Sequence, residues 1–164
     1  MAVTTSSLIG ANFAQSDATA LYTLGTVATG TGGSWFEYCE FTATQITGRL
    51  VLITPDGTAM GLLTAKLTAS AIGYDIGAVQ NVMSQGQFGW VARKGRSLYV
   101  SITGTLTAGG DVAFAAAGGK LENIAGAAVG QTAFGVWITT SDSAQSLVKA
   151  TLATLLWPTS AIKP

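Results

Sequence analysis

The chain of 164 residues contains no histidine and a single cysteine, Cys39. Without histidine it lacks the side chain that most often acts as a general base and binds transition metals. Ser-His-Asp and Cys-His catalysis and zinc binding are therefore excluded. One cysteine cannot form an intrachain disulfide, which excludes a disulfide-stapled secreted scaffold. We expect Cys39 to be a small apolar residue within a strand.

Charged residues are also scarce, at 10% of the chain against about 25% in an average soluble domain. Eight basic and eight acidic residues cancel to a net charge of zero. The long-range field that draws proteins to nucleic acid is therefore missing, and we expect no nucleic-acid partner. The carboxylates are scattered, and Glu37 and Glu40, the nearest strand pair, fall on opposite faces. We expect no catalytic residues, no cofactor and no metal site, and hence no enzyme.

Signals for export or for a membrane helix are lacking too. Residues 1–7 have neither the basic nor the apolar region of a signal peptide. The most apolar stretches, 112–117 and 147–157, are shorter than the roughly 20 residues of a membrane helix. We expect synthesis in the cytoplasm and no membrane partner.

Hydrophobic residues, in contrast, make up 48% of the chain. A surface with so little charge is either buried against other chains or kept hydrated by the abundant Thr, Ser and Gly. We favour burial against other chains, because obligate interfaces are the more hydrophobic kind.

Short segments rich in β-branched and aromatic residues alternate with glycine-containing turns, and no long amphipathic helix is present. This pattern predicts an all-β fold, a β-sandwich or small β-barrel of about eight short, mostly antiparallel strands. Residues 1–20 are dominated by Ala, Ser and Thr, which predicts an extended N-terminal arm, either frayed or ordered on a neighbouring subunit. Residues 21–158 form the β domain, and 159–164 a C-terminal tail.

Several strands can be placed individually. A glycine-rich hairpin loop at 28–34 separates predicted strands at 21–27 and 35–43. The second of these has mixed faces, which predicts a place at an edge or an interface. Residues 49–54 are apolar on both faces, as in a central strand. Residues 60–70 are predicted to be a loop with at most a short helix, and later strands are expected at 111–117, 134–138 and 147–157.

The stretch 77–103 is predicted to be a meander of three antiparallel strands. Its dividers are the tetrapeptide 84–87 and a corner formed by Lys94, Gly95 and Arg96. Alternation places Phe88 and Trp90 on one face, and Gly89 between them indicates a bulge or a close backbone approach.

The same corner holds the one concentration of charge in the sequence. It is either a solvated turn that prevents edge pairing or a contact with acidic groups of a partner. Tryptophan similarly belongs either to a core or to an interface. The candidate interface residues are Arg93, Lys94, Arg96, Trp35, Phe36 and Trp90.

Several segments together resemble small β proteins of tailed-bacteriophage virions, similar to head decoration (cement) proteins. These segments are Leu24-Gly25-Thr26-Val27, Trp35-Phe36-Glu37-Tyr38, Ile76-Gly77-Ala78-Val79, and Phe88-Gly89-Trp90-Val91 with Gly95. The resemblance spans roughly residues 21–157. It implies a homo-oligomer, often a trimer, on the capsid exterior of the virion and bound to the major capsid protein. It brings no catalytic residues.

Two other roles remain open. The chain could be a different virion component, in the tail, the connector or a fibre. It could also be a carbohydrate-binding β-sandwich that stacks sugars on Trp35 or Trp90.

Overall fold

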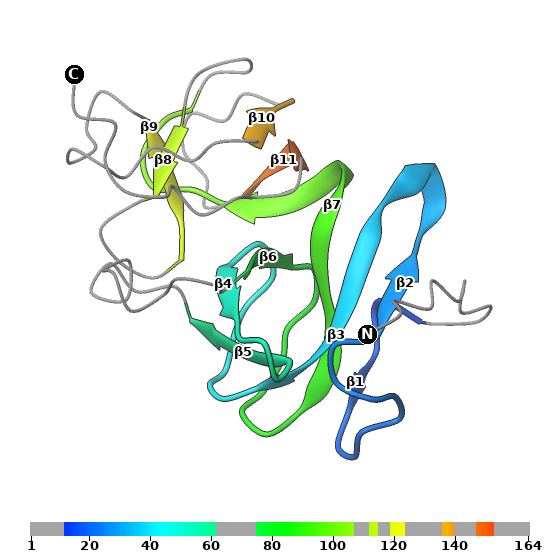
Figure 1. Cartoon of the computed structure of the whole chain (residues 1–164). Helices are drawn as coiled ribbons and strands as arrows, with labels where there is room; N and C mark the ends of the chain where they lie inside the picture. The colour runs from blue at the N-terminus through cyan, green and yellow to red at the C-terminus, as the bar shows by residue number, and fades with distance from the viewer. Residues whose placement is uncertain are drawn as a thin grey trace.

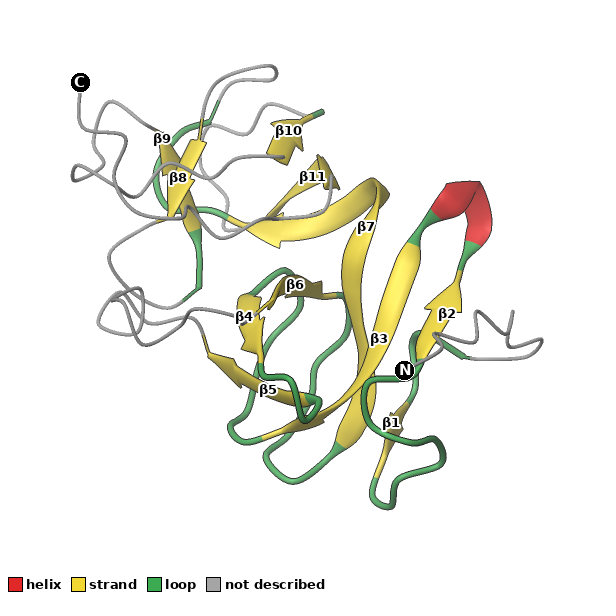
Figure 2. Cartoon of the chain, in the orientation of Figure 1, coloured by secondary structure: helices red, strands yellow, loops and turns green. Residues whose placement is uncertain are grey.

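In the computed structural model of the chain, the described residues are 12–61, 75–106, 112–114, 119–123, 136–139 and 147–152. They form strands with one short 3-10 turn, η1 (Thr31–Gly33), so the predicted all-β class is confirmed (Figure 2). No helix among them is long and apolar enough to cross a membrane. The strands are β1 (Ser16–Asp17), β2 (Val27–Thr29), β3 (Trp35–Phe41), β4 (Leu50–Ile53), β5 (Thr58–Gly61), β6 (Asp75–Val79), β7 (Phe88–Ser101), β8 (Val112–Phe114), β9 (Leu121–Asn123), β10 (Val136–Ile138) and β11 (Leu147–Leu152).

Five of these strands close into a barrel (Figure 1). Around the ring, β3 pairs with β7, β7 with β6, β6 with β4 and β4 with β5, all antiparallel. The parallel pair of β5 with β3 completes it. Of the two predicted architectures, the strand pairing therefore selects the small barrel, and closure leaves none of these five strands as a free edge.

The remaining strands extend this barrel. β1 and β2 add to β7 and β3, respectively. The second half of β7 leaves the ring and pairs with β11, which pairs with β10. The hairpin of β8 and β9 forms a separate two-stranded sheet. In Figure 1, β7 is the element that passes from the barrel to the β10–β11 side of the molecule.

The barrel interior is filled by apolar side chains that range in size from Ala to Phe: Cys39, Phe41, Val51, Ile53, Ala59, Val79, Met83 and Val91. Two glycines make this packing possible. A Cβ built on Gly77 would lie 2.3 Å from Cγ1 of Val91, and one on Gly89 would lie 2.5 Å from Cε of Met83. The close approach predicted at Gly89 is therefore confirmed.

A second core covers the outside of the barrel. Phe36, Tyr38 and Trp90 lie on the outer faces of β3 and β7 and are covered by Phe13 and Tyr22 of the N-terminal segment. This explains the mixed faces of β3, because alternate side chains enter two different cores. The prediction that β3 lies at an edge is wrong, since it pairs with β2, β5 and β7. β4 is buried on both faces, as predicted.

Phe13 belongs to the part of residues 1–20 that the structure describes, and it packs on this chain's own barrel. Its ring stacks on Phe36 with 4.1 Å between centroids. Nearby, the hydroxyl of Tyr38 donates to Asp17 Oδ2 at 3.1 Å and accepts the N–H of Leu21 at 3.1 Å. Residues 12–24, which we call the N-terminal segment, are thus held to β3 and β7; residues 1–11 and the predicted tail lie outside the described residues.

The predicted three-stranded meander is wrong at its second divider. β7 runs without interruption from Phe88 to Ser101, and Lys94-Gly95-Arg96 is a bend within it. Gly95 (φ 151°) and Ser97 (φ 56°) have positive φ values, which redirect the strand without reversing it. Beyond the bend, the Gln80 side chain pairs with the Tyr99 backbone, accepting its N–H at 2.9 Å and donating to its carbonyl at 3.1 Å.

Two further predictions need correction. Of the predicted strand 21–27 only Val27 is in a strand, because the apolar spacing there comes from Tyr22 and Leu24, which pack on the outer core from an irregular segment. Residues Thr58–Gly61 form β5 after a turn at Gly57 (φ 83°), although residues 60 and 61 are predicted to lie in a loop. The predictions for 62–70, 111, 115–117, 134–135 and 153–157 lie outside the described residues.

Candidate interface at the bend of β7

The bend of β7 gathers most of the predicted interface residues. Trp35 begins β3 and is paired with Lys94, with a register shift between Trp35 and Phe36. Arg93 and Arg96 flank Lys94 along β7. The structure therefore places β3's first residue and the three basic residues in one region, where the β2–β3 hairpin lies beside β7 (Figure 1).

Three of these side chains are at the surface. Trp35 is 46% exposed, and Lys94 Nζ lies 5.3 Å from the centroid of its ring. Such a cation–π contact contributes about 0.5–1 kcal/mol at an exposed site. Arg96 is exposed as well. We call Trp35, Lys94 and Arg96 the basic-aromatic surface.

A second aromatic and cation pair follows along the same strand. Tyr99 is 41% exposed, and Lys149 Nζ of β11 lies 5.8 Å from its ring centroid. Lys149 and Tyr99 are paired in the β7–β11 ladder, so the sheet itself brings them together. The sequence gives no local sign of this pair, because its members are 50 positions apart and only the pairing of β11 with β7 joins them.

Phe36 and Trp90 lie inside the chain. Trp90 is 2% exposed, and its ring contacts those of Phe13, Tyr22 and Tyr38 at centroid distances of 5.1–5.5 Å. Phe36 is 7% exposed under Phe13. Both rings hold the N-terminal segment on the barrel, and neither is open to a partner or a sugar.

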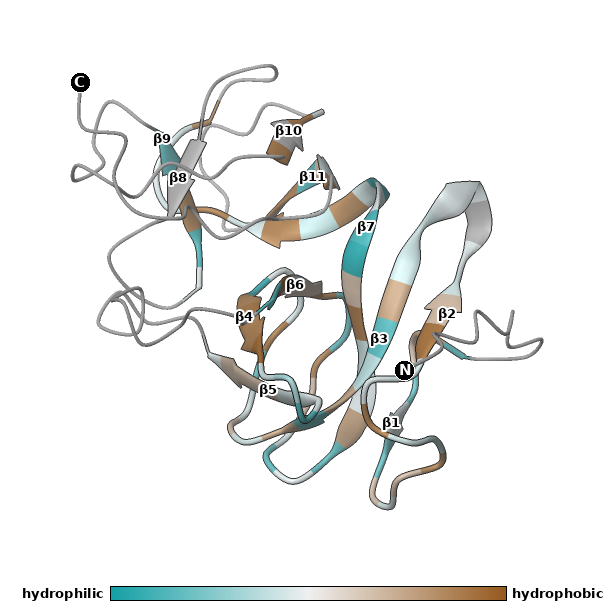
Figure 3. Ribbon diagram, in the orientation of Figure 1, coloured by the Kyte–Doolittle hydropathy of each residue, from teal (hydrophilic) through white to brown (hydrophobic). Residues whose placement is uncertain are grey.

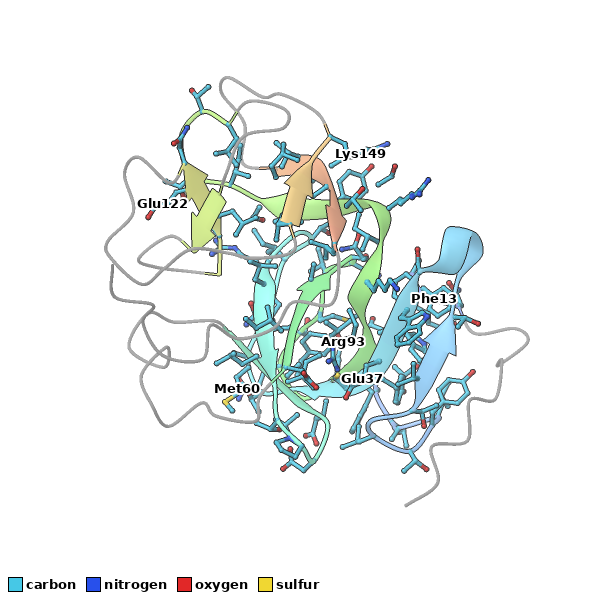
Figure 4. The ribbon with its side chains drawn as sticks, turned by 45° about the horizontal axis from the view of Figure 1, so that its top comes forward. Phe13, Glu37, Met60, Arg93, Glu122 and Lys149 are labelled. Carbon is cyan, nitrogen blue, oxygen red and sulfur yellow. The ribbon has the colours of Figure 1, made fainter. Side chains whose placement is uncertain are left out.

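Arg93 also turns inward, because it has the same parity on β7 as Val91 in the barrel interior. It forms ion pairs with Glu37 Oε2, through Nη1, and with Asp75 Oδ2, through Nη2 at 2.8 Å. The side chains of Arg93 and Glu37 are only 16% and 11% exposed. Figure 4 shows Arg93 and Glu37 next to each other where β3 meets β7. We call Glu37, Asp75 and Arg93 the barrel ion cluster.

Glu37 and Arg93 form the buried part of this cluster, whereas the Asp75 side chain is 52% exposed. Burial raises the pKa of Glu37 above its ordinary value, and the Arg93 charge and hydrogen bond oppose that rise. Arg93 Nε is buried and has no hydrogen-bond partner among the described residues. Sequence reasoning missed this cluster. The alternation of side chains along a strand could have indicated it, since Glu37, Cys39 and Phe41 lie on the same face of β3 and point toward one core.

Cys39 is a buried apolar residue in β3, as predicted. Burial is the largest cause that raises the pKa of its thiol far above the ordinary range, which keeps it protonated and unreactive. Within the described part of the chain, no three His, Cys, Asp or Glu side chains are grouped so that they could hold a metal ion.

No protein-family model matches the chain, and no curated protein matches it. One solved structure to which the chain is similar is the head fiber gp8.5 N base in bacteriophage phi29. The sequence identity is 8%, the TM-score is 0.47, and the match covers 73% of this chain and 94% of that chain.

Proposed function

We propose that this chain is a structural protein of a bacteriophage virion, and that it decorates the capsid exterior by binding the major capsid protein as a homo-oligomer, most simply a trimer. The observation that carries this proposal is the basic-aromatic surface on a chain with only 16 charged side chains. Exposed Trp paired with cations is typical of protein contacts, where aromatic residues and Arg are enriched.

Further apolar groups on the surface support the same conclusion. Figure 3 shows hydrophobic segments on the outer strand β2 as well as in the barrel. A surface that carries large apolar side chains and few charges is suited to repeated burial against other chains. The exposed large hydrophobic residues are Leu21, Val27, Trp35, Ile46, Val82 and Tyr99.

Several of the residues that carry the resemblance to virion proteins have packing roles in this fold. Gly77 and Gly89 make room in the interior, and Gly95 lies against Ser34. Trp90 fills the outer core. These residues are packing residues, so the proposed role depends on the exposed side chains and on the sparse charge.

We propose that the protein stabilises the shell through binding alone. A protein that binds the assembled shell and not its free subunits stabilises the shell by mass action, by about 2.7 kcal/mol per site at a free concentration 100 times the Kd. Each bound copy therefore opposes the loss of a capsomer, and no reaction is needed.

The test uses purified phage shells offered to the full chain. We expect the protein to sediment with the shells and to raise the temperature at which packaged DNA is released. The W35A/K94A variant should bind more weakly, while its circular dichroism and melting temperature stay close to those of the parent. Shells that ignore the protein and release DNA at an unchanged temperature would contradict decoration.

Electron microscopy of virions labelled with an antibody to this chain separates the head from other positions. Label on the tail, the connector or a fibre would assign the protein to that structure and overturn decoration. The structure does not favour the carbohydrate-binding alternative. Trp90 is buried, and Lys94 lies over one face of the Trp35 ring.

A further inference from the structure

The chain has zero net charge, but its charged side chains are unevenly distributed along β7. Two strands meet β7 at its first residue, and both bring a carboxylate there: Asp17 of β1 and Glu40 of β3 are each paired with Phe88. Asp56 lies close to Glu40, since the N–H of Glu40 donates to the carbonyl of Gly57 at 3.1 Å. We call Asp17, Glu40 and Asp56 the acidic end.

The opposite charge lies further along the same strand. Lys94 and Arg96 follow Phe88 by six and eight positions, which places Lys94 about 20 Å away at roughly 3.3 Å per residue. In Figure 1, the start of β7 is at the bottom of the view and its bend is near the top. Neither Lys94 nor Arg96 forms an ion pair with a described residue, and the carboxylates of Glu37 and Asp75 are bound by Arg93.

The two ends act independently in solution. Their separation of about 20 Å exceeds the Debye length of about 10 Å at 0.1 M salt, so neither end is neutralised by the other. An intact chain therefore presents one positive and one negative surface. Opposite surfaces on identical molecules attract each other and fix their relative orientation.

We propose that the partner of the basic-aromatic surface is the acidic end of a second copy of this chain, so that copies associate head to tail. This contact is heterologous, and it forms a ring when the rotation between copies closes. Trp35 supplies apolar contact beside the two cations, as a buried anchor does in stable interfaces. The inference specifies the self-association in the proposed function and rests on it for the biological role.

The test measures self-association by sedimentation velocity at concentrations up to roughly 100 μM. K94E/R96E reverses the charge of the basic end, and E40K/D56N neutralises the acidic end, because the introduced lysine offsets Asp17, while Asn keeps the turn at position 56. We expect each variant alone to associate at least tenfold more weakly than the parent, and the parent to weaken with added salt. K120E, a Lys-to-Glu change outside both ends, is the control and should associate like the parent.

Mixing is the decisive measurement. The intact acidic end of K94E/R96E meets the intact basic end of E40K/D56N, so an equimolar mixture should regain association that neither variant has alone. A parent chain that stays monomeric, variants that associate normally, or a mixture that does not regain association would each overturn the head-to-tail contact.

Shell binding separates this inference from the proposed function. If K94E/R96E is monomeric and binds shells more weakly than the parent, as expected for W35A/K94A, both stand. If K94E/R96E associates normally and loses shell binding, the shell is the partner of the basic-aromatic surface, which overturns the inference and keeps decoration. Regained association in the mixture without any shell binding by the parent supports the inference and contradicts decoration.

Discussion

At the scale of single residues, the barrel ion cluster is where one substitution can leave a buried charge without its partner. Replacing Arg93 with Met leaves Glu37 buried without its counter-charge, and breaking a buried pair in this way typically costs about 3–5 kcal/mol. We expect R93M to lose that much in urea unfolding. The double variant E37Q/R93M should regain a large part of it, because no uncompensated charge remains.

Lys94 provides the matched control, since it is the next residue on β7 and is exposed. K94M removes a cation as well but leaves no buried charge behind, so its cost should stay below about 1 kcal/mol. An R93M variant as stable as K94M would show that the ion cluster contributes little.

The raised pKa of Glu37 gives a pH dependence with a definite sign. The ordinary value is 4.5, and the folded state keeps the proton to higher pH because burial disfavours the carboxylate. Between 4.5 and the raised pKa the folded chain binds more protons than the unfolded chain, so Glu37 makes the free energy of unfolding fall as pH rises. Above the raised pKa this contribution is constant.

The measurement is the difference in free energy of unfolding between the parent and E37Q from about pH 4 to pH 8, which cancels the other carboxylates. The parent should lose stability relative to E37Q as pH rises through the window above 4.5. In R93M the window should extend to higher pH. A parent that gains stability relative to E37Q over this range would mean that the Arg93 pairing outweighs burial.

At the scale of the element, Gly95 decides whether β7 can bend. Its φ of 151° is unfavourable for other residues, and an added Cβ would lie 2.8 Å from Cβ and 3.2 Å from Cα of Ser34. G95A therefore combines backbone strain with a clash against Ser34, the residue before β3, and we expect a loss of about 2–4 kcal/mol.

Gly86 separates these two causes. It also has a positive φ, 77°, but a Cβ there would meet nothing within 4 Å. G86A should cost about 1 kcal/mol from strain alone. Thermal melts of both variants test the difference, and equal losses would remove the packing against Ser34 as a cause.

The same bend shows how far strand prediction reaches. Alternation correctly placed Phe88 and Trp90 on one face, and the two apolar faces of β4 correctly indicated burial on both sides. Lys94-Gly95-Arg96 has the composition of a hairpin corner, and nothing local distinguishes a reversal from a bend. The pairing of β11 with the second half of β7 determines that the chain bends here and does not reverse. That contact joins residues about 50 positions apart.

At the scale of the whole molecule, one sheet serves two cores. Alternate residues of β3 and β7 enter the barrel or the outer core, so neither core can be lost without loosening the other. The sequence predicted the all-β class and left sandwich or barrel open, because closure depends on the β5–β3 pair, which local periodicity does not encode. Of the candidate interface residues, Trp35, Lys94 and Arg96 are exposed, whereas Arg93 is bound within the barrel ion cluster, and Phe36 and Trp90 are buried.

The N-terminal segment gives the last prediction. A chain that begins at residue 21 lacks Phe13, which covers Phe36 and Trp90, and lacks the Asp17 carboxylate that accepts the Tyr38 hydroxyl. We expect it to melt well below the full chain, whereas a chain that begins at residue 12 keeps both contacts and should melt close to it.

Single substitutions check the same contact without shortening the chain. F13A should cost about 3 kcal/mol, because truncating a packed ring leaves a cavity between Phe36 and Trp90. L21A is the control, since Leu21 is 62% exposed, and it should change the stability by less than about 0.5 kcal/mol. If the chain from residue 21 and F13A are both as stable as the full protein, residues 12–20 contribute nothing to the fold and act as an arm. Loss of stability in both would instead place the start of the folded domain before Phe13.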